Sequence, residues 1–409
     1  MKGRKNILLI RLSNSSILVV AVLLLVGIPT AAGMATYHRA SPRNGSAAPS
    51  TLRITDQVFA NSYFVDSVAR IGHTALCSVE LTNFTFELVL VNLSSNTTRV
   101  LSGSAGAVSG NIPSTSIAVG DHQFLEIYRN SSTGVSTFQS VNLSGAVRTL
   151  GASFPAGPFW RLLAANTSRA WLVGNNFTGV ASSFLELNSR SLNVVHNYTS
   201  SIPRGASLSA VLTENTSVYM AGSRPAAHGA TTVAYFGILN LATGTIASRM
   251  VPPHNAPANV SGSFTSLIDQ GGQVYVGGIY QAHVNVSWFA NYLGGYLYRY
   301  SPSTGRFLND SSVLPSGGIN GAGVIQLEPW GKNIAIVDYA NFINFTYFAQ
   351  STYTYVLSHH GNVLTNVTAL LPSQFFSASN LLTEPRGGPY IAAGWDNSNG
   401  DGEMVSVRV

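Results

Sequence analysis

The sequence is poor in cysteine and in charge. A single cysteine, Cys77, stands among 409 residues, which excludes an intramolecular disulfide bond. Lys, Arg, Asp and Glu make up 9% of the chain, against about 25% in an average soluble domain. The composition is still not that of a disordered protein, because 45% of the residues are apolar. The polar surface must therefore consist mainly of Ser, Thr, Asn and Gly, which suits short strands joined by turns.

The formal net charge of +6 is concentrated at the N-terminal end. Six of the 22 basic residues flank an early apolar run: Lys2, Arg4, Lys5, Arg11, Arg39 and Arg43. The other 16 basic residues match the 16 acidic ones, so the remainder of the chain is formally neutral. A basic stripe that follows a phosphate backbone is therefore not expected, and we expect no nucleic-acid partner.

The early apolar run, residues 17–34, predicts export. It holds 18 uncharged residues, near the lower limit for a membrane-spanning helix. Basic residues before it predict a cytoplasmic N-terminus and a C-terminal part outside the cell membrane. Ala31-Ala32-Gly33 also fits a signal-peptidase site. Two alternatives stay open: a single-pass signal anchor, or a cleaved signal peptide and a secreted product. The expected organisation is a basic cytoplasmic segment (1–16), this helix (17–34), a flexible linker (35–51) and one folded domain (52–409).

Asn-x-Ser/Thr sequons give a second indication of export. They begin at Asn44, Asn83, Asn92, Asn96, Asn130, Asn142, Asn166, Asn176, Asn197, Asn215, Asn259, Asn285, Asn309, Asn344 and Asn366. Several fall in predicted turns, where a glycan would not disturb packing. A chain rich in Asn, Ser and Thr also generates sequons by chance, so glycosylation is an expectation.

A strand that ends in a small residue recurs along the folded domain. Its seven copies are 75–78, 117–120, 171–174, 219–222, 275–278, 335–338 and 391–394. Six of them are followed by a strand that enters a polar turn, from Leu88, Phe124, Phe184, Tyr235, Tyr296 and Thr352. Such a repeat predicts an all-β fold, a β-propeller with four strands per blade. Seven blades are expected, with six or eight as alternatives, and residues 52–59 should pair with the incomplete last unit to close the ring.

One unit, residues 273–307, resembles the kelch repeat. Gly271-Gly272 precedes the strand Val-Tyr-Val-Gly-Gly, and Tyr300 is followed seven positions later by Phe307, where kelch repeats have Trp. In this unit Ser303-Thr304-Gly305 supplies the positive φ of a hairpin turn. The resemblance implies a kelch-like β-propeller.

Three predicted loops between second and third strands are long: 223–231, 280–292 and 339–350. The last two are rich in aromatic side chains, which are costly to expose. Three alternatives stay open: these two segments pack together as a lid, they form a binding patch, or they belong to longer strands. The candidate ligand-binding residues are Tyr280, His283, Trp288, Phe289, Tyr292, Tyr339, Phe342, Phe345 and Tyr347.

Other candidate sites are weaker. Asn397–Gly402 has the composition of half a calcium loop, but also that of a hairpin. His228, His254 and His283 fall in loops of neighbouring units. No metal site and no cofactor are expected, and Cys77 is expected to be buried.

Function is the least constrained property. We expect a membrane-tethered, glycosylated propeller whose surface binds an unknown protein or glycan. The alternatives are an exported carbohydrate-active hydrolase and a structural surface-coat component. Acids including Asp66, Asp121, Glu126 and Asp338 could converge at the axis of the ring, where paired carboxylates would support hydrolysis. A binding role is favoured over an enzymatic one.

Overall fold

The computed structural model describes a large part of the predicted folded domain. The described residues are 53–59, 62–103, 111–154, 158–176, 180–214, 216–226, 231–252, 260–283, 290–314, 322–330, 333–344, 347–357, 363–366, 376–382, 390–396 and 401–408. No helix among them is long and apolar enough to cross a membrane. The predicted segments 1–16, 17–34 and 35–51 lie outside the described residues.

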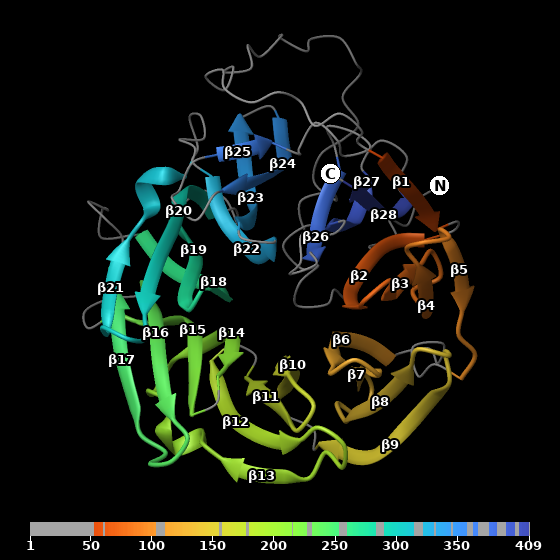
Figure 1. Ribbon diagram of the computed structural model, residues 1–409, viewed down its shortest axis with the longest axis horizontal. Helices are drawn as coiled ribbons and strands as arrows, with labels where there is room; N and C mark the ends of the chain where they lie inside the picture. The colour runs from red at the N-terminus through yellow and green to blue at the C-terminus, as the bar shows by residue number, and fades with distance from the viewer. Residues whose placement is uncertain are drawn as a thin grey trace, which may run out of the picture. The chain divides into compact units, whose positions relative to one another are not determined.

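The strands form seven four-stranded antiparallel sheets, shown in Figure 1. The first three sheets in chain order are β2 (Ser62–Ile71), β3 (Thr74–Leu81), β4 (Phe86–Asn92) and β5 (Thr97–Val100); β6 (Asn111–Val119), β7 (Gln123–Asn130), β8 (Ser136–Asn142) and β9 (Val147–Phe154); and β10 (Phe159–Ala165), β11 (Arg169–Asn175), β12 (Ala181–Asn188) and β13 (Val194–Asn197). The next three are β14 (Ser207–Thr213), β15 (Ser217–Pro225), β16 (Thr232–Asn240) and β17 (Ile246–Val251); β18 (Val260–Gln270), β19 (Gln273–His283), β20 (Ala290–Ser301) and β21 (Arg306–Asn309); and β22 (Ala322–Trp330), β23 (Asn333–Asn344), β24 (Tyr347–Leu357) and β25 (Val363–Asn366). The last sheet has the order β1 (Arg53–Phe59), β28 (Asp401–Arg408), β27 (Tyr390–Asp396) and β26 (Phe376–Leu382). Two short 3-10 turns, η2 (Thr199–Ser201) and η3 (Ser311–Val313), complete the described elements.

The first strands of the sheets form a closed cycle. Contacts join β2 to β6, β6 to β10, β10 to β14, β14 to β18, β18 to β22, β22 to β26, and β26 back to β2. These seven strands surround the centre of the ring in Figure 1. We call them the axial strands.

Every axial strand has a β-bulge at the same place. The extra residue of each bulge is Asp66, Ser114, Leu163, Ser209, Thr265, Ile325 or Ser379. A bulge bends its strand and increases the local twist. Its repetition in all seven sheets shows that the sheets are copies of one structural unit, although their sequences differ at this position.

Contacts between neighbouring sheets repeat in the same register. The hydroxyl of Ser67 lies 2.8 Å from that of Ser116 on the next axial strand. Four sheets along the ring, Leu327 N donates to Ser266 Oγ at 3.0 Å. In both pairs the residue one position after a bulge meets the residue two positions after the next bulge. Neighbouring axial strands therefore run in the same direction, so corresponding ends of the sheets face the same way.

The predicted closing strand is confirmed. β1 pairs antiparallel with β28, from Arg53 opposite Arg408 to Phe59 opposite Gly402. The last sheet thus combines both ends of the domain. Phe59 is buried in one core cluster with Met404, which contacts Cys77 at 3.7 Å between the sulfur atoms. The closing strand is therefore connected to the first complete sheet as well as to its own.

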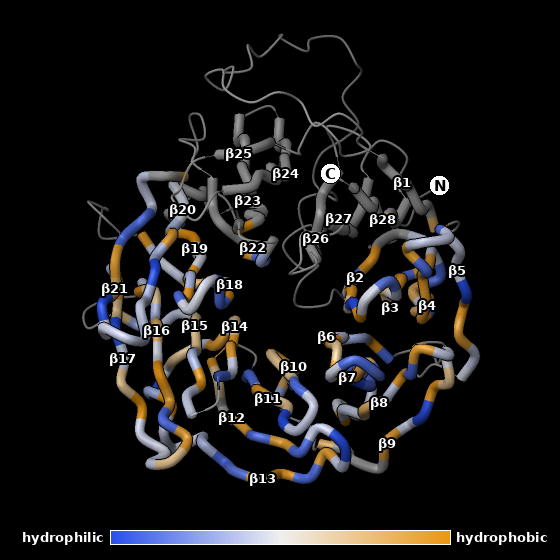
Figure 2. Tube along the Cα trace, in the orientation of Figure 1, coloured by the Kyte–Doolittle hydropathy of each residue, from blue (hydrophilic) through white to orange (hydrophobic). Residues whose placement is uncertain are grey.

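The apolar core lies between neighbouring sheets, and apolar residues alternate with polar ones along many strands in Figure 2. Trp171 and Phe184 of one sheet pack with Met220 and Tyr235 of the next. Alternation follows from the pleat, which sends successive side chains to opposite faces. Cys77 is fully buried, as predicted.

Hairpin turns confirm the prediction at Gly305. Its φ is +64°, and its N–H donates to the carbonyl of Ser301 at 2.8 Å. Gly134 and Gly244 have φ values of +72° and +67° and donate in the same way to Asn130 and Asn240. A residue with a side chain would be strained at these positions.

One detail of the predicted repeat is wrong. Residues 117–120 end the axial strand β6, whereas the second strand of that sheet is β7. The sequence Ile-Ala-Val-Gly imitates a second strand because both strands bury apolar residues.

Strands occupy much of the predicted loops 280–292 and 339–350, and the start of the loop 223–231. β19 runs to His283 and β20 starts at Ala290, and β23 and β24 leave only two residues between them. β15 runs to Pro225 and β16 starts at Thr232. Part of each aromatic segment therefore belongs to longer strands than predicted, while residues 284–289 and 345–346 lie outside the described residues.

Candidate functional site

Charged side chains gather on the axial strands β2 and β10 and on the second strands β3 and β7 beside them. In β10, Trp160 and Leu162 point into the core between sheets, while Phe159, Arg161 and Leu163 are half-buried on the opposite face. This alternation is that of a pleated strand with one dry face. It places the Arg161 guanidinium outside the apolar core, although it lies deep among protein atoms.

Asp66 is the bulge residue of β2. Its side chain is half-buried, and burial raises its pKa to about 7. The nearby negative charge of Glu80 raises this pKa further, whereas the positive charge of Arg161 lowers it. A carboxyl group that keeps some accessible surface but is surrounded by protein is typical of a narrow opening.

Glu126 on β7 is fully buried. Ser116 Oγ donates to Glu126 Oε1 at 3.0 Å, and the Ser67 hydroxyl lies 2.8 Å from that of Ser116. Burial raises the pKa of Glu126 to about 8, and the charge of Asp66 adds to this increase. The surrounding hydroxyl groups, of which Ser116 has the largest effect, oppose the increase because they favour the ionised form. Its second oxygen, Oε2, has no hydrogen-bond partner in ordinary geometry among the described residues. Glu126 is therefore mainly protonated at neutral pH.

Glu80 and Arg161 complete this group, which we call the axial charged cluster: Asp66, Glu80, Glu126 and Arg161. Burial raises the pKa of Glu80 and lowers that of Arg161, while Asp66 opposes the change at Arg161. Arg161 has neither a hydrogen bond nor an ion pair with any described residue. Its coupling to Asp66 is thus electrostatic and leaves its N–H donors available.

A second guanidinium lies next to the cluster. Arg129 of β7 stacks over the ring of Phe159, with its central carbon 3.7 Å from the ring centroid. Burial lowers the pKa of Arg129, and its Nε has no hydrogen-bond partner in the described part of the chain. A cation over an aromatic face gains a modest electrostatic stabilisation.

Another axial strand carries a further raised carboxyl group. Gln326 Nε2 donates to Glu328 Oε1 at 2.9 Å on β22. Burial raises the pKa of Glu328 to about 7, and the hydrogen bond opposes the change. Polar groups therefore line the axial strands at more than one sheet.

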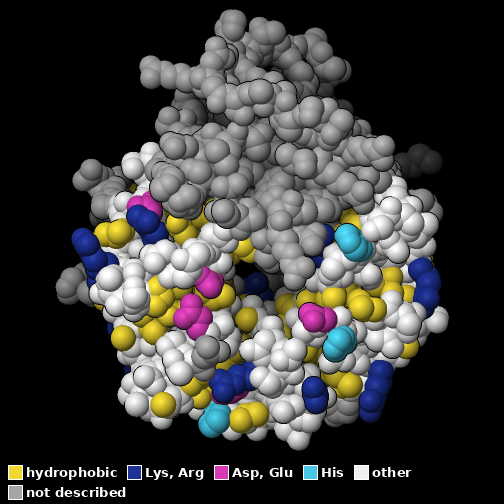
Figure 3. Space-filling view, in the orientation of Figure 1, with side chains coloured by type: hydrophobic (Ala, Val, Ile, Leu, Met, Phe, Trp, Pro, Cys, Tyr) yellow, Lys and Arg dark blue, Asp and Glu magenta, His cyan; other side chains and the backbone are white. Residues whose placement is uncertain are grey.

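The ring is open at its centre on the face shown in Figure 3. Acidic side chains lie beside this hollow, and a basic side chain is visible inside it.

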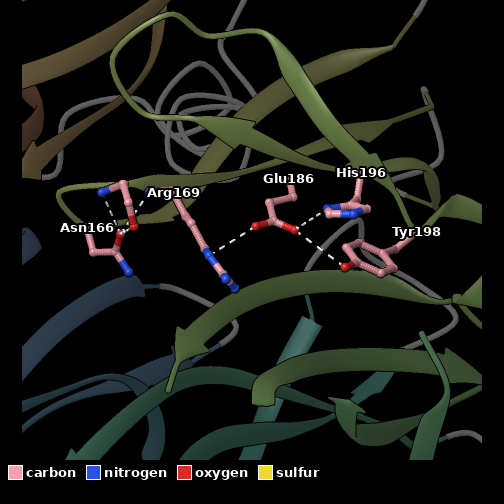
Figure 4. A network of polar contacts seen from close by, with 6 residues as sticks. Asn166, Arg169, Glu186, His196 and Tyr198 are labelled. Carbon is pink, nitrogen blue, oxygen red and sulfur yellow. Dashed lines mark hydrogen bonds and ion pairs between the residues drawn. The ribbon is translucent and has the colours of Figure 1, made fainter. Parts of the chain in front are cut away.

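A separate polar network occupies the outer strands β12 and β13, shown in Figure 4. Glu186, which is 3% exposed, pairs with Arg169 at 3.2 Å and with His196 Nδ1 at 3.0 Å. The Tyr198 hydroxyl donates to the same carboxylate at 3.4 Å, and burial, followed by the charge of Glu186, raises the pKa of Tyr198. Asn166 Oδ1 accepts from the backbone N–H of Arg169. Both oxygens of Glu186 are satisfied, so this network is structural.

The predicted aromatic residues are only partly described. Tyr280 is half-buried, with its ring centroid 5.2 Å from that of Tyr296. The backbones of His283, Tyr292, Tyr339, Phe342 and Tyr347 lie in β19, β20, β23 and β24, but their side chains are outside the described residues, as are Trp288, Phe289 and Phe345 entirely. The ligand-binding role assigned to this set stays a prediction.

Several sequon asparagines lie at strand ends or in turns, and most of those described are exposed. The Oδ1 atoms of Asn83, Asn92, Asn142, Asn166 and Asn197 accept hydrogen bonds from the residues that follow them. Asn130 Oδ1 accepts in the same way from Ser132 and Thr133, and its Nδ2 also donates to Asn111 Oδ1 at 2.9 Å. The predicted glycosylation itself remains a prediction.

The structure brings together two of the four predicted acids. Asp66 and Glu126 interact, Asp121 is exposed in the turn between β6 and β7, and the side chain of Asp338 is not described. Residues 397–400, His228 and His254 are also outside the description. Within the described ranges, no group of three His, Cys, Asp or Glu could hold a metal ion. Sequence reasoning missed Glu80 and Arg161, because Glu80 reaches Asp66 through the pairing of β3 with β2, and Arg161 reaches it from the axial strand β10, two sheets along the ring.

Comparisons with known proteins agree with this topology. No protein-family profile and no curated protein matches the chain. Among solved structures, the propeller domain of the Trilobed protease from Pyrococcus furiosus is similar at 10% identity and a TM-score of 0.50, over 82% of this chain and 93% of that one. The chain has the fold of a β-propeller.

Two further similar structures show how varied the proteins with this fold are. A polysaccharide lyase, an ulvan lyase of family PL25, has a TM-score of 0.54 at 10% identity, over 87% of this chain and 96% of that one. A prolyl endopeptidase has a TM-score of 0.53 at 13% identity, over 82% of this chain, which spans 45% of that longer protein. None of these neighbours adds support for the kelch type in particular.

Proposed function

We propose that the chain is an extracytoplasmic, seven-bladed β-propeller that binds a glycan or a protein at its axial strands. The axial charged cluster carries this proposal. Only 9% of the chain is charged, and the fold does not require charge here, since the other bulge positions hold Ser, Leu, Thr or Ile. Placing charges deep in the protein costs free energy, so a ligand that uses them accounts for their position.

We infer that the predicted aromatic residues extend a site at the same end of the sheets as part of this cluster. Glu80 is near the end of β3 and Arg161 near the start of β10, so both lie towards the connection between second and third strands. The hairpin between β19 and β20, which carries Trp288 and Tyr292, leaves its sheet at the corresponding end. A ligand held at the axis could therefore extend over these aromatic side chains.

A glycan array and a cell-surface pull-down with the full chain test this function. The wild type should retain a glycan or a protein, and Asp66→Asn should weaken that retention. The Trp288→Ala/Tyr292→Ala variant tests the aromatic extension separately. If Asp66→Asn retains every ligand as well as the wild type does, binding occurs elsewhere and the axial placement is wrong.

A carbohydrate-active enzyme is the second candidate, and the coupled carboxyl groups favour it. A group with a pKa of about 7, such as Asp66, can act as a general acid at neutral pH. Glu126 is fully buried and cannot touch a substrate, so Glu80 would be the partner carboxylate. Incubation with a panel of polysaccharides, followed by product analysis, tests this role. Products that form equally with Asp66→Asn would rule it out.

Location and processing belong to the same proposal. The N-terminal apolar run would tether the propeller to the cell membrane or be removed as a signal peptide. Sequencing the N-terminus of the mature protein distinguishes the two, and peptide mapping of the exposed sequons tests glycosylation.

A further inference from the structure

Two guanidinium groups follow one another on neighbouring sheets. Phe159 and Arg161 lie two positions apart on the same face of β10, about 7 Å along the strand. Arg129 of β7 lies over the ring of Phe159, at 3.7 Å from its centroid. A single small ligand could therefore reach both arginines.

Neither guanidinium is neutralised by the described part of the chain. Arg169 and Arg299 form ion pairs with Glu186 and Asp310, but Arg161 has no such pair and Arg129 Nε is buried without a hydrogen-bond partner. Asp66 compensates for Arg161 only in part, because burial keeps the pKa of this carboxyl at about 7. Two partly desolvated cations, of which only Arg161 is partly compensated by Asp66, are unfavourable, and a bound anion would relieve this.

We propose that Arg129 and Arg161 bind the carboxylate of an acidic saccharide. The inference rests on the proposed binding function and names its ligand class. Arginine is suited to carboxylates because its N–H donors match the two oxygens. Asp66 and Glu80, beside this site, would accept hydrogen bonds from hydroxyl groups of the sugar. A peptide with several carboxylates would instead be repelled by these two acids.

The test compares two forms of one ligand. The probe is a disaccharide of one glucuronate and one neutral sugar, and its control is the same disaccharide with the carboxylate reduced to an alcohol. Calorimetric titration of the full chain should give at least tenfold tighter binding of the acidic form. Equal affinities for the two forms, or no binding of either, would overturn the inference.

Variants locate the site. Arg161→Gln should abolish the preference for the acidic form, whereas Arg190→Gln, in the exposed turn between β12 and β13, should keep it. Arg129→Gln provides a second variant and should reduce the preference. A preference that survives both Arg129→Gln and Arg161→Gln would place the anion elsewhere and refute the assignment.

Two further arms separate this inference from its alternatives and from the parent proposal. A triglutamate peptide that binds as tightly as the acidic disaccharide would overturn the saccharide assignment. Retention of neutral glycans alone on the array would contradict this inference while supporting the proposed function. Absence of any retained glycan or protein would contradict the proposed function itself. Unfolding midpoints of Arg161→Gln should lie close to those of the wild type, because the change removes a partly desolvated charge together with its coupling to Asp66.

Discussion

Replacing Glu126 by Gln should change how the stability of the protein depends on pH. Burial raises the pKa of this carboxyl from 4.5 to about 8. The folded protein therefore holds a proton that the unfolded chain releases above pH 4.5. As pH rises from 4.5 to 8, the unfolded state gains by ionising this group while the folded state does not, so stability falls.

The size of this effect follows from the difference between the two pKa values. At 1.36 kcal/mol per pH unit, the interval from 4.5 to about 8 corresponds to roughly 5 kcal/mol of lost stability above pH 8. A neighbouring positive charge, or water that penetrates to Glu126, would reduce this loss of stability. Roughly 5 kcal/mol is therefore an upper value. Asp66 contributes in the same direction between its ordinary value and about 7. Glu126→Gln keeps the shape and the bond from Ser116 but cannot ionise.

Guanidinium unfolding between pH 5 and pH 9, followed by tryptophan fluorescence, measures this difference. The variant should match the wild type near pH 5 and exceed it increasingly towards pH 9. Glu87→Gln, in strand β4 of the neighbouring sheet, controls for the loss of one carboxyl group. Parallel stability curves for the wild type and Glu126→Gln across this range would refute the buried, protonated state.

The remaining predictions concern the closure and the packing of the sheets. Phe59→Ala should lower the free energy of unfolding by about 3 kcal/mol or more, measured by denaturant titration, because Phe59 joins the closing strand to a buried cluster; an unchanged midpoint would mean that closure contributes little. Gly222→Ala should cost about 3 kcal/mol or more, because its Cβ would lie 1.8 Å from the Ser207 carbonyl oxygen. Gly271→Ala, with a φ of +63° and open space around it, should cost only about 1 to 2 kcal/mol, so equal losses would contradict this geometry. The Cys77 thiol, whose pKa burial raises to about 12, should react with a thiol reagent only after unfolding, and fast labelling of the native protein would show that it is accessible.

The fold was largely predictable because the repeat is visible in the local pattern of apolar residues and turn residues. Apolar alternation marked most second and third strands, and turn glycines such as Gly305 marked the hairpins. The incomplete last unit and the unassigned strand at 52–59 together predicted the closure between β1 and β28. The prediction for the second unit was wrong, because residues 117–120 have the composition of a second strand but end an axial strand.

The candidate site was only partly predictable because it depends on contacts between distant residues. Asp66 and Glu126 were named from the sequence only as two of four acids that could converge at the axis. Arg161 carries no sequence signal, since its partner Asp66 lies two axial strands away in the ring. The bulge at Asp66 could not be predicted from the sequence either, because the seven bulge positions share no residue type.

Recognition of a ligand at the axial strands is the central claim, and one comparison tests it most directly. The full chain and its Asp66→Asn/Arg161→Gln variant are applied to the same glycan array, with His196→Ala of the outer network as the matched control. We predict that the double variant loses the signal of the wild type and that His196→Ala retains it. A signal that persists in the double variant would contradict the claim.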